Sequence, residues 1–599
     1  MRKFLKNLFR FVSDTLICEL PLFVISFVLL NPMWFSVLKK DLLEGALLLL
    51  MTDKIVTCDL YATLLFSWII SGSVVAVAKL SYKSAKILKT VIYICLIISF
   101  LVRKFLLWEF DMDYGPQVLS LVQETNIQES QGFIQTFLLC NKGLMYLGVL
   151  FFVIAVIVLI EWIFRRYLIK RIDTKFVRLP MTFFFFLLLP LCVKSMSNYE
   201  TLKTYSGENT ITGIMAAWGI LQETKQETSD FIETVEQMSR ISELASCKEQ
   251  GLDIVFVLGE SFIKKHASIY QYDLCTMPHM EQEIQQGNLY LLNDVISPFA
   301  RTTPSFKNIM SLNNLAKNER WCDGAFLPLI FHKSGWNVEM WDNQRAGDRH
   351  FVGSFHEMWN GKVSQLCYNY ISDIPYKYDE DIINGLSRSK TLCGNYTDSY
   401  TPNSVNNLFF IHFKGQHFPV RANFPDTVKT FSAVNILRRE NWITESMKEA
   451  IANYDNAIVY NDIVLYKLFN IFRKRKAVIV YISDHGEEVY DYRDKSNRPA
   501  LQNDMISEYA HYQHDTPCMI WISDSYKEMY PEVVNQVIKA KDVPYTHDLI
   551  GNMLLTLAHI QTKYYQSSDD VLNLSYKKRK RVIFPNGRSN LKYYEDMIK

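Results

Sequence analysis

The chain has 599 residues, of which 49% are hydrophobic and 21% are charged, and its formal net charge is +2. This length is too great for one compact domain, and a net charge close to zero argues against nucleic acid as the main partner. The averages hide a break in composition. Apolar runs dominate the sequence up to about Met196, whereas the part after Ser197 has the composition of a globular protein.

Five apolar stretches in the first part are predicted membrane spans. The second and the fourth are uncharged over nearly the roughly 20 residues that cross a bilayer. The third carries Arg103 and Lys104 near its end, where their charged groups would have to reach the interface, and the fifth is short before Lys194. For the third and the fifth stretch, an interfacial or core helix is the alternative. The five stretches are Leu16–Phe35, Leu60–Ala78, Val91–Trp108, Leu144–Trp162 and Leu179–Met196.

The flanking charges predict an orientation. Basic residues gather before the first span, between the second and third, and between the fourth and fifth, while the other two connections are mixed or acidic. The positive-inside rule then places the N-terminus in the cytoplasm, and five crossings place everything after Lys194 on the outer side. The first span is not predicted to be a removable signal peptide, because no small-residue cleavage site follows it.

Segments outside the spans suggest how the two parts are joined. Tyr114–Phe137 has mixed polarity and is either a helix on the membrane surface or a connector. We expect Leu202–Gly219 to be a loop, and Leu221–Leu244 carries apolar residues at helical spacing, which predicts an amphipathic linker helix. The expected division is therefore a transmembrane domain over 1–200, a linker over 201–248 and an exported domain over 249–599.

Cysteine and lysine-arginine patterns in the exported part leave alternatives open. Six of the 11 cysteines fall there, and an even number permits disulfides without fixing their pairing. The basic run Lys577–Arg581 is either a solvated charge cluster or a contact for anionic lipid or phosphorylated sugar. The six cysteines are Cys247, Cys275, Cys322, Cys367, Cys393 and Cys518.

From Leu252 onward, strand and helix patterns alternate. This alternation predicts an α/β domain with a mostly parallel central sheet and helices on both faces. The predicted strands are Leu252–Gly259, Val338–Trp341, Leu408–Phe413, Ala477–Ser483 and Met519–Ser523. The predicted helices are Ser305–Leu312, Ala325–Lys333, Thr444–Phe472 and Thr546–His559.

Chemically active side chains follow the ends of these strands. Glu260 comes directly after an apolar strand, and Asp484 and His485 come directly after another. Open α/β sheets bind ligands at the carboxyl ends of their strands. Glu260 is therefore a metal ligand, a base or a helix-capping partner. An imidazole with two carboxylates, such as Glu260 and Asp484, is a zinc-type ligand set.

Two further groups complete the candidate site. The turn Ser297–Ser305 leads into a predicted helix, and a hydroxyl just ahead of a helix either caps the helix or acts as a nucleophile toward phosphate. A threonine oxygen would supply a fourth ligand, and the metal would lower the pKa of that hydroxyl. His417 lies beyond a strand end and could hold a phosphate oxygen or protonate a leaving alcohol. His412, within the strand, is expected to be structural.

The sequence resembles the phosphoethanolamine transferases of Gram-negative envelopes, which belong to the alkaline phosphatase/sulfatase superfamily. The resemblance implies an inner-membrane protein with five spans and a periplasmic, alkaline-phosphatase-like domain. It is closest to the lipopolysaccharide-core type, where a proline precedes the threonine segment, and not to the lipid A type, where cysteines flank it. The matching segments are Leu258–Ser261, Ser297–Thr302, Gly415–His417, Tyr454–Ala457 and Ser483–Glu488.

By this resemblance, Glu260, Thr302, Asp484 and His485 bind a catalytic zinc ion, and whether a second metal ion binds stays open. Thr302 would take phosphoethanolamine from phosphatidylethanolamine as a phospho-threonine and pass it to lipopolysaccharide, on a core sugar or on lipid A. Thr303 is the alternative nucleophile, because the Thr-Thr pair leaves the register uncertain by one residue.

The resemblance also suggests substrate-binding residues. Asn343, Gln344 or Arg345 follow a matching strand and could touch substrate. The family has a histidine downstream of Asp-His-Gly, for which His511 and His514 are both candidates. Asp455 and Asn456 are interpreted as structural residues or as supports of the site.

Other functions remain to be weighed. A glycerol-phosphate transferase that uses phosphatidylglycerol, or a phosphoryl or sulfuryl hydrolase, would share the superfamily. A hydrolase would not need five spans, and a sulfatase would carry a Cys/Ser-x-Pro-x-Arg segment after the first strand, which this sequence lacks. A non-catalytic envelope scaffold is a third alternative, although Glu260, Asp484 and His485 are all present.

Overall fold

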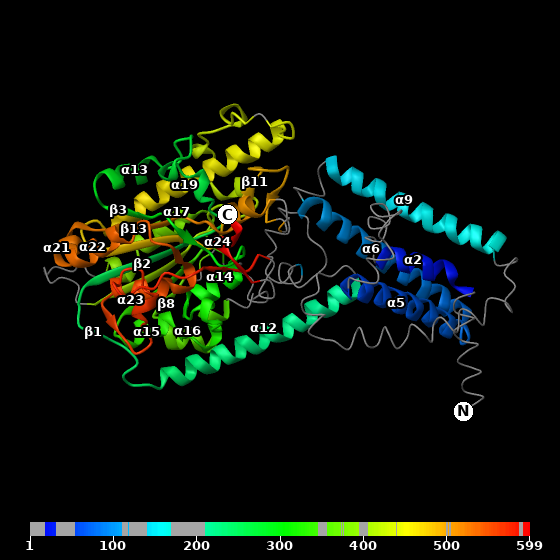
Figure 1. Cartoon of the computed structure of the whole chain (residues 1–599), viewed down its shortest axis with the longest axis horizontal. Helices are drawn as coiled ribbons and strands as arrows, with labels where there is room; N and C mark the ends of the chain where they lie inside the picture. The colour runs from blue at the N-terminus through cyan, green and yellow to red at the C-terminus, as the bar shows by residue number, and fades with distance from the viewer. Residues whose placement is uncertain are drawn as a thin grey trace. The chain divides into compact units, whose positions relative to one another are not determined.

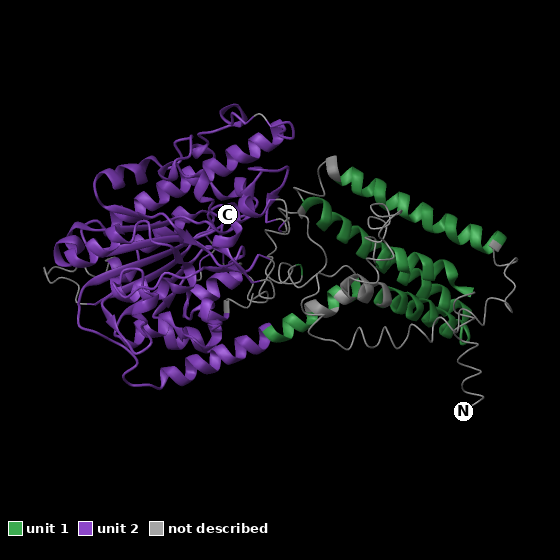
Figure 2. Cartoon of the chain, viewed as in Figure 1, with its two compact units in different colours: residues 1–122, 131–223 green, residues 123–130, 224–599 purple. Residues whose placement is uncertain are grey.

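The chain forms two compact units, residues 1–122 with 131–223 and residues 123–130 with 224–599 (Figure 2). The predicted division into three parts stays a prediction. The computed structural model describes residues 18–30, 54–110, 118, 134, 141–168, 210–344, 356–372, 374, 376–393, 405–438, 440–498, 501, 505–585 and 591–599.

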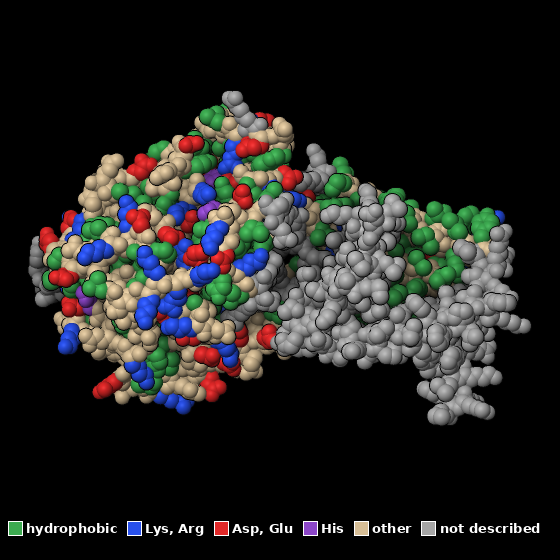
Figure 3. All heavy atoms as spheres, in the orientation of Figure 1, with side chains coloured by type: hydrophobic (Ala, Val, Ile, Leu, Met, Phe, Trp, Pro, Cys, Tyr) green, Lys and Arg blue, Asp and Glu red, His purple; other side chains and the backbone are tan. Residues whose placement is uncertain are grey.

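Apolar helices make up the described part of the N-terminal unit. They are α2 (Leu20–Leu30), α5 (Lys54–Ala78), α6 (Tyr82–Phe110) and α9 (Asn141–Ile163), the last followed by the π-helix η2 (Phe164–Leu168). Only Tyr82–Glu109 and Gly143–Tyr167, among the described residues, are long and apolar enough to cross a membrane, while Leu20–Leu30 and Ala62–Ala78 are shorter apolar helices. Hydrophobic side chains gather over α9 (Figure 3).

The count of five spans therefore stays a prediction. The third and fourth predicted spans coincide with the two long apolar helices, and the first and second with the shorter ones. The fifth, Leu179–Met196, lies outside the described residues. Arg103 does not reach outward as expected, because its side chain is buried and its Nη1 donates to Leu30 O at 3.3 Å.

An ion-pair cluster holds the helices of this unit together. Lys89 of α6 pairs with Glu161 of α9 at 2.6 Å and also with Glu19, next to α2. Tyr93 donates to the same Glu161 at 2.5 Å. Because these groups come from α6, α9 and the residue that precedes α2 and are largely shielded from water, each charge needs its partners, and the cluster fixes how the helices pack.

The linker helix α12 (Thr210–Ser239) is longer at its start than predicted. The segment expected to be a loop up to Gly219 is helical from Thr210. In its second half α12 buries Phe231 and Val235 against the C-terminal unit, where the Phe231 ring lies 5.0 Å from Phe326. The apolar spacing thus identified the packed face of the helix but neither of its ends, because the helix was predicted to run to Leu244 and stops at Ser239.

The C-terminal unit is built on a seven-stranded sheet in the order β3-β13-β10-β2-β9-β7-β8 (Figure 1). Five neighbouring strands of this sheet run parallel to one another, in the order β10, β2, β9, β7 and β8. Strand β13 runs antiparallel to both of its neighbours. The sheet is mixed and mostly parallel, as predicted. Its strands are β2 (Leu252–Gly259), β3 (Leu289–Leu292), β7 (Asn337–Asp342), β8 (Tyr370–Ile371), β9 (Asn407–His412), β10 (Lys476–Ser483) and β13 (Cys518–Ile522).

Helices cover both faces of this sheet, because alternate side chains of a strand point to opposite faces. Every residue of β2 is buried. Ile254 and Phe256 pack with the second half of α12 and with α14, α15, α16 and α23. Val255 and Val257 pack with α13, α17 and α19 on the other face. The helices are α13 (Pro278–Gln285), α14 (Thr302–Ile309), α15 (Leu327–Lys333), α16 (Gly361–Cys367), α17 (Asp379–Ser387), α19 (Glu445–Phe472) and α23 (Ile550–Leu557).

Short elements complete the unit. The further helices are α18 (Lys390–Cys393), α20 (Ile506–His514), α21 (Asp524–Met529), α22 (Pro531–Lys539) and α24 (Tyr594–Met597). The two-residue strand pairs are β1 (Ser246–Cys247) with β15 (Ile560–Gln561), β4 (Val295–Ile296) with β14 (Tyr545–Thr546), β5 (Ser311–Leu312) with β6 (Ala325–Phe326), β11 (Glu488–Val489) with β12 (Ser496–Asn497), and β16 (Val582–Ile583) with β17 (Lys592–Tyr593).

Cysteine pairing is not seen in the described part of this unit. Five of its six cysteines are free thiols, and the side chain of Cys393 lies outside the described residues. The free thiols are Cys247, Cys275, Cys322, Cys367 and Cys518.

Candidate active site

The ends of β2 and β10 bring the predicted acidic residues and the imidazole to one edge of the sheet. These strands pair in parallel over their whole length, and Asp484 N extends the ladder by donating to Gly259 O at 3.0 Å. A Cβ on Gly259 would lie 2.1 Å from the hydroxyl of Tyr481, so the position accepts no side chain. Glu260, Asp484 and His485 therefore emerge side by side.

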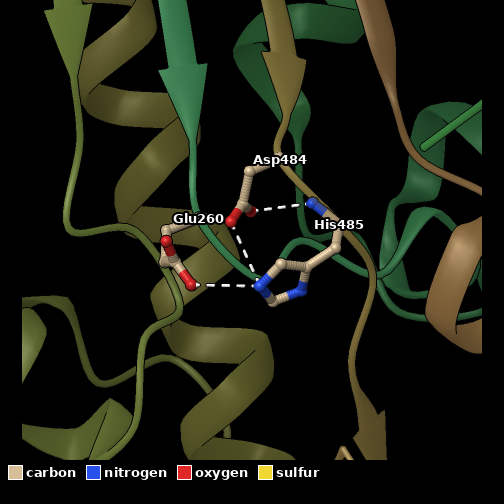
Figure 4. A group of neighbouring side chains, drawn as sticks. All are labelled: Glu260, Asp484 and His485. Atoms are coloured by element: carbon tan, nitrogen blue, oxygen red, sulfur yellow. Dashed lines mark hydrogen bonds and ion pairs between the residues drawn. The ribbon is translucent and has the colours of Figure 1, made fainter. Parts of the chain in front are cut away.

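These three side chains form one fully buried cluster (Figure 4). His485 Nε2 lies 3.4 Å from Glu260 Oε1 and 3.1 Å from Asp484 Oδ2. The other ring nitrogen, Nδ1, lies 2.6 Å from Gly486 O, which requires a proton on Nδ1. His485 Nε2 is thus the nitrogen that faces both carboxylates, and a proton or a metal ion on it would satisfy them.

The hydroxyl of Thr302 lies beside this cluster. Thr302 is the first residue of α14, and its Oγ1 lies 3.0 Å from Glu260 Oε2 and 3.4 Å from His485 Nε2. The hydroxyl of Thr303 is buried and has no hydrogen-bond partner in the described part of the chain. Of the two threonines, Thr302 is the one that the helix turns toward the acids.

The electrostatics of the cluster favour a bound cation. Burial raises the pKa of Asp484, and the neighbouring charge of Glu260 raises it further, to about 6. Burial alone would also raise the pKa of Glu260, but the hydrogen bond and charge of His485 hold it well below its usual range. Two buried carboxylates this close need positive charge between them.

The hydrogen bonds of Asp484 indicate that these residues could hold a metal ion. Asp484 Oδ1 accepts from Ser261 N at 3.0 Å and from His485 N at 2.8 Å, which fixes the carboxylate. Its Oδ2 is buried and, apart from the approach to His485 Nε2, has no hydrogen-bond partner among the described residues. Carboxylate oxygens and an imidazole nitrogen, with the hydroxyl of Thr302, make a four-ligand set of the kind that zinc takes.

His417 lies beside this cluster, on the loop that follows β9. Gly415 turns that loop with φ +47°, and its backbone lies so close to Glu260 that a Cβ would meet Glu260 O at 3.0 Å. Gln416 N donates to Glu260 O at 3.1 Å. The charge of His417 also lowers the pKa of Glu260, and its Nδ1 is buried with no hydrogen-bond partner among the described residues.

Of the substrate-binding candidates that follow β7, the structure brings one to the cluster and places another away from it. Asn343 is buried and donates to Asp379 at 2.6 Å, and the same carboxylate accepts the backbone N–H groups of Lys414 and Gly415. Asn343 therefore braces the His417 loop and does not face the cluster. Gln344 does reach it, since its Nε2 donates to Glu260 Oε2 at 3.0 Å. Arg345 lies outside the described residues.

The two downstream histidines also separate. His511 lies on α20 with its Nδ1 3.1 Å from the hydroxyl of Tyr594, so the structure does not bring it to the cluster. His514 is buried behind the cluster, where its Nδ1 donates to Ser297 O at 2.8 Å and Ser297 Oγ donates to Asp484 O at 2.6 Å. Burial lowers the pKa of His514 to about 4, so the ring is neutral.

Arg498 is the residue of this site that sequence reasoning missed. Its Nη1 lies 3.0 Å from His485 Nε2, although the residue follows His485 by 13 positions. No local pattern marks it, because the hairpin of β11 and β12 brings it back to the cluster.

Residues of α19 support the site from behind. The hydroxyl of Tyr454 donates to Ser261 O and accepts from Ile263 N, which holds the segment after Glu260. Asn456 Oδ1 accepts the backbone N–H groups of Thr430 and Phe431 at 2.8 and 2.7 Å.

A mostly parallel sheet with a threonine at a helix start, facing acids and an imidazole at the strand ends, defines an alkaline-phosphatase-like domain. Residues 253–560 match the sulfatase family model, which is half of the chain, and the chain belongs to that family. The predicted relationship to the phosphoethanolamine transferases of this superfamily is confirmed.

Individual relatives of this chain are named phosphoethanolamine transferases. Phosphoethanolamine transferase EptA of Escherichia coli K12 is 24% identical over 390 residues, which is 63% of this chain and 65% of that protein. EptC of the same organism is 20% identical over 493 residues, 79% of this chain and 80% of that protein. The match to EptA therefore spans slightly less than two thirds of its length.

A solved structure shows the same fold. It is the integral membrane protein lipooligosaccharide phosphoethanolamine transferase A from Neisseria meningitidis, with a TM-score of 0.57 and 18% identity. The comparison covers 93% of this chain and 97% of that chain.

Proposed function

We propose that this protein is a metal-dependent transferase of the bacterial inner membrane that moves phosphoethanolamine from phosphatidylethanolamine to a lipopolysaccharide acceptor, through a phospho-threonine at Thr302. The observation that carries the proposal is the position of Thr302 Oγ1, 3.0 Å from Glu260 and 3.4 Å from His485 Nε2 at the start of a helix. The names of the relatives, phosphoethanolamine transferases EptA and EptC, support the choice of phosphoethanolamine. Another relative, 23% identical over 309 residues, is named a Kdo(2)-lipid A phosphoethanolamine transferase, which supports a lipopolysaccharide acceptor.

In the first half of the reaction, Thr302 Oγ1 attacks the phosphorus of the lipid headgroup. Its hydroxyl proton passes to Glu260, whose two carboxylate oxygens lie 3.2 and 3.0 Å away. The bond from phosphorus to the diacylglycerol oxygen breaks, and His417 supplies the proton that this leaving oxygen needs. The backbone N–H groups at the start of α14 face the phosphoryl oxygens and stabilise their charge.

Zinc is the metal that suits this ligand set, held by Glu260, Asp484, His485 and the oxygen of Thr302. Bound there, it would lower the pKa of the threonine hydroxyl and offset negative charge on the phosphoryl group. His485 keeps its proton on Nδ1 through Gly486 O, and Ser261 N and His485 N hold Asp484, so the ligands are oriented in advance.

In the second half, a hydroxyl of the acceptor attacks the phosphorus of phospho-Thr302 and gives its proton to His417, while the bond from phosphorus to Thr302 Oγ1 breaks and Glu260 returns the proton to that oxygen. This is ping-pong chemistry, because the donor lipid has left before the acceptor reacts. Donor and acceptor are both lipid-linked, which agrees with the long apolar helices α6 and α9. The proposed topology has a cytoplasmic N-terminus and a periplasmic catalytic domain. Arg345 remains a proposed contributor to substrate binding, whereas His514, behind the cluster, is proposed to support Asp484 through Ser297.

The experiment is intact-mass analysis of the detergent-purified chain after incubation with zinc and phosphatidylethanolamine vesicles. We expect one phosphoethanolamine adduct on the wild-type protein and on Thr303→Ala, and none on Thr302→Ala. An adduct on Thr302→Ala would refute the assignment of the nucleophile. An adduct formed only from phosphatidylglycerol vesicles would make the protein a glycerol-phosphate transferase instead.

A further inference from the structure

A rigid hairpin delivers Arg498 to the transfer site. Its strands pair Glu488 with Asn497 and Val489 with Ser496, so the chain turns back toward His485. Two residues that lack the freedom of glycine, Tyr490 at the start of the turn and Asn497 in β12, hold positive φ angles of 56° and 71°. Backbone of this kind persists only where surrounding contacts fix it.

Several contacts fix this hairpin. The guanidinium of Arg493 makes a bidentate pair with Glu488, at 2.8 and 3.0 Å, and both side chains are buried. Asp491 bonds to His266 at 2.8 Å, and Gln513 Nε2 donates to Asn497 O at 3.1 Å. The backbone that carries Arg498 is therefore held in place.

The guanidinium of Arg498 meets the same imidazole nitrogen as the proposed nucleophile. Arg498 Nη1 lies 3.0 Å from His485 Nε2, and Thr302 Oγ1 lies 3.4 Å from that atom. A phosphorus atom bonded to Thr302 Oγ1 would hold its free oxygens within reach of this guanidinium. Arginine suits that task, because its planar donors bind two oxygens of a phosphoryl group at once.

The Nε2 nitrogen of His485 has a single lone pair, which can either bind a metal ion or accept a hydrogen bond. His485 Nε2 cannot accept from Arg498 and bind a metal ion at the same time. When the ion takes the nitrogen, the N–H group of Arg498 that faced it can donate to an oxyanion placed beside the ion. The charge of Arg498 also lowers the pKa of Glu487, which burial raises, so the guanidinium helps to balance the acids there.

We propose that Arg498 is a catalytic residue that binds the free oxygens of the phosphoryl group, first on the donor lipid and then on phospho-Thr302. This inference rests on the proposed function for the identity of the substrate. It gives Arg498 a part in substrate binding, for which the family resemblance had suggested His511 or His514.

The test uses the full-length protein in detergent with zinc and inorganic phosphate as the only ligands. Arg498→Gln should weaken phosphate binding to the zinc-loaded protein at least tenfold by calorimetry, and Arg498→Lys should recover part of the loss. Arg388→Gln, which removes an exposed arginine at the end of α17, is the matched control and should change nothing.

Zinc affinity separates binding from a structural role. If Arg498 binds phosphate, Arg498→Gln removes a cation that competes with zinc, and the zinc affinity should be unchanged or tighter. If Arg498 only stabilised the fold, the same substitution would lower the zinc affinity. Loss of zinc from this variant, or phosphate affinity equal to wild type at full zinc occupancy, would overturn the inference.

The same variant distinguishes the inference from the proposed function. In the phosphatidylethanolamine assay, we expect Arg498→Gln to form the Thr302 adduct about a hundredfold more slowly, which is a typical loss for one oxyanion-binding donor. If the wild-type protein forms no adduct while phosphate binding still depends on Arg498, the proposed function fails and the inference stands.

Discussion

His266 offers the sharpest test of how the site is held in shape. Its side chain is 1% exposed, with Nδ1 2.6 Å from Asp455 Oδ1 and Nε2 2.8 Å from Asp491 Oδ1. Both ring nitrogens therefore face carboxylates, and a protonated ring satisfies both. Burial alone would lower the pKa of His266, but the charges of Asp491 and Asp455 raise it to about 9. The ring thereby ties α19 to the segment that follows the proposed zinc ligands.

The size of the effect follows from this shift. The folded-state pKa of about 9 lies above the unfolded value of 6.5, so protonation of His266 stabilises the folded chain. At about 1.4 kcal/mol for each pKa unit, the contribution is about 3 kcal/mol. Because the folded pKa is the higher one, this stability is fully present below pH 6.5 and is lost as the pH rises through about 9.

Urea unfolding of the full chain in detergent, measured below pH 6.5 and above pH 9, checks the prediction. The wild-type protein should lose about 3 kcal/mol across this window. His266→Gln should be less stable by a similar amount at the lower pH and nearly independent of pH within the window. His511→Gln is the control, because burial lowers the pKa of His511 and its titration lies below the window. An unchanged pH dependence in His266→Gln would refute the reasoning.

Two further substitutions probe the cluster itself. Gly415→Ala should destabilise the protein by about 1–2 kcal/mol and weaken zinc binding, because its φ is +47° and the new Cβ would meet Glu260 O at 3.0 Å. Gly335→Ala, at φ +85° with nothing within 4 Å of the new Cβ, should lose stability but keep its zinc affinity, and equal zinc affinities in the two variants would contradict the contact with Glu260. Glu260→Gln should lower the zinc content measured by mass spectrometry, whereas the exposed Glu532→Gln should not, and full zinc occupancy in Glu260→Gln would remove this residue from the ligand set.

The sequence was enough to place the acids and the imidazole. Apolar, β-branched runs are buried on both faces in parallel sheets, so Leu252–Gly259 and Ala477–Ser483 could be identified as central strands. The carboxyl ends of parallel strands meet at one edge, which brings Glu260 to Asp484 and His485. Thr302 was expected ahead of a helix predicted at Ser305–Leu312 and was preferred to Thr303 only through the family resemblance, whereas in the structure α14 begins at Thr302 itself.

Residues placed by distant contacts were out of reach. Arg498 is positioned by a hairpin held by other side chains. Gln344 was named only as one of three candidates after its strand, and its contact with Glu260 depends on β7 lying two places from β2 in the sheet. The basic run near the C-terminus was interpreted as a solvated cluster or a lipid contact, yet Arg581 is buried and bonds to Asp294 at 2.6 Å and Glu595 at 2.7 Å. Charge along the chain does not reveal such partners, since they lie far apart in sequence.

The measurement that bears most directly on the proposed transferase is mass spectrometry of lipopolysaccharide incubated in vesicles with the purified chain, zinc and phosphatidylethanolamine. We predict that the acceptor gains the mass of one phosphoethanolamine with the wild-type protein and none with Thr302→Ala. Unmodified lipopolysaccharide alongside free phosphoethanolamine released by the wild-type protein would instead identify a hydrolase and contradict the proposed transfer.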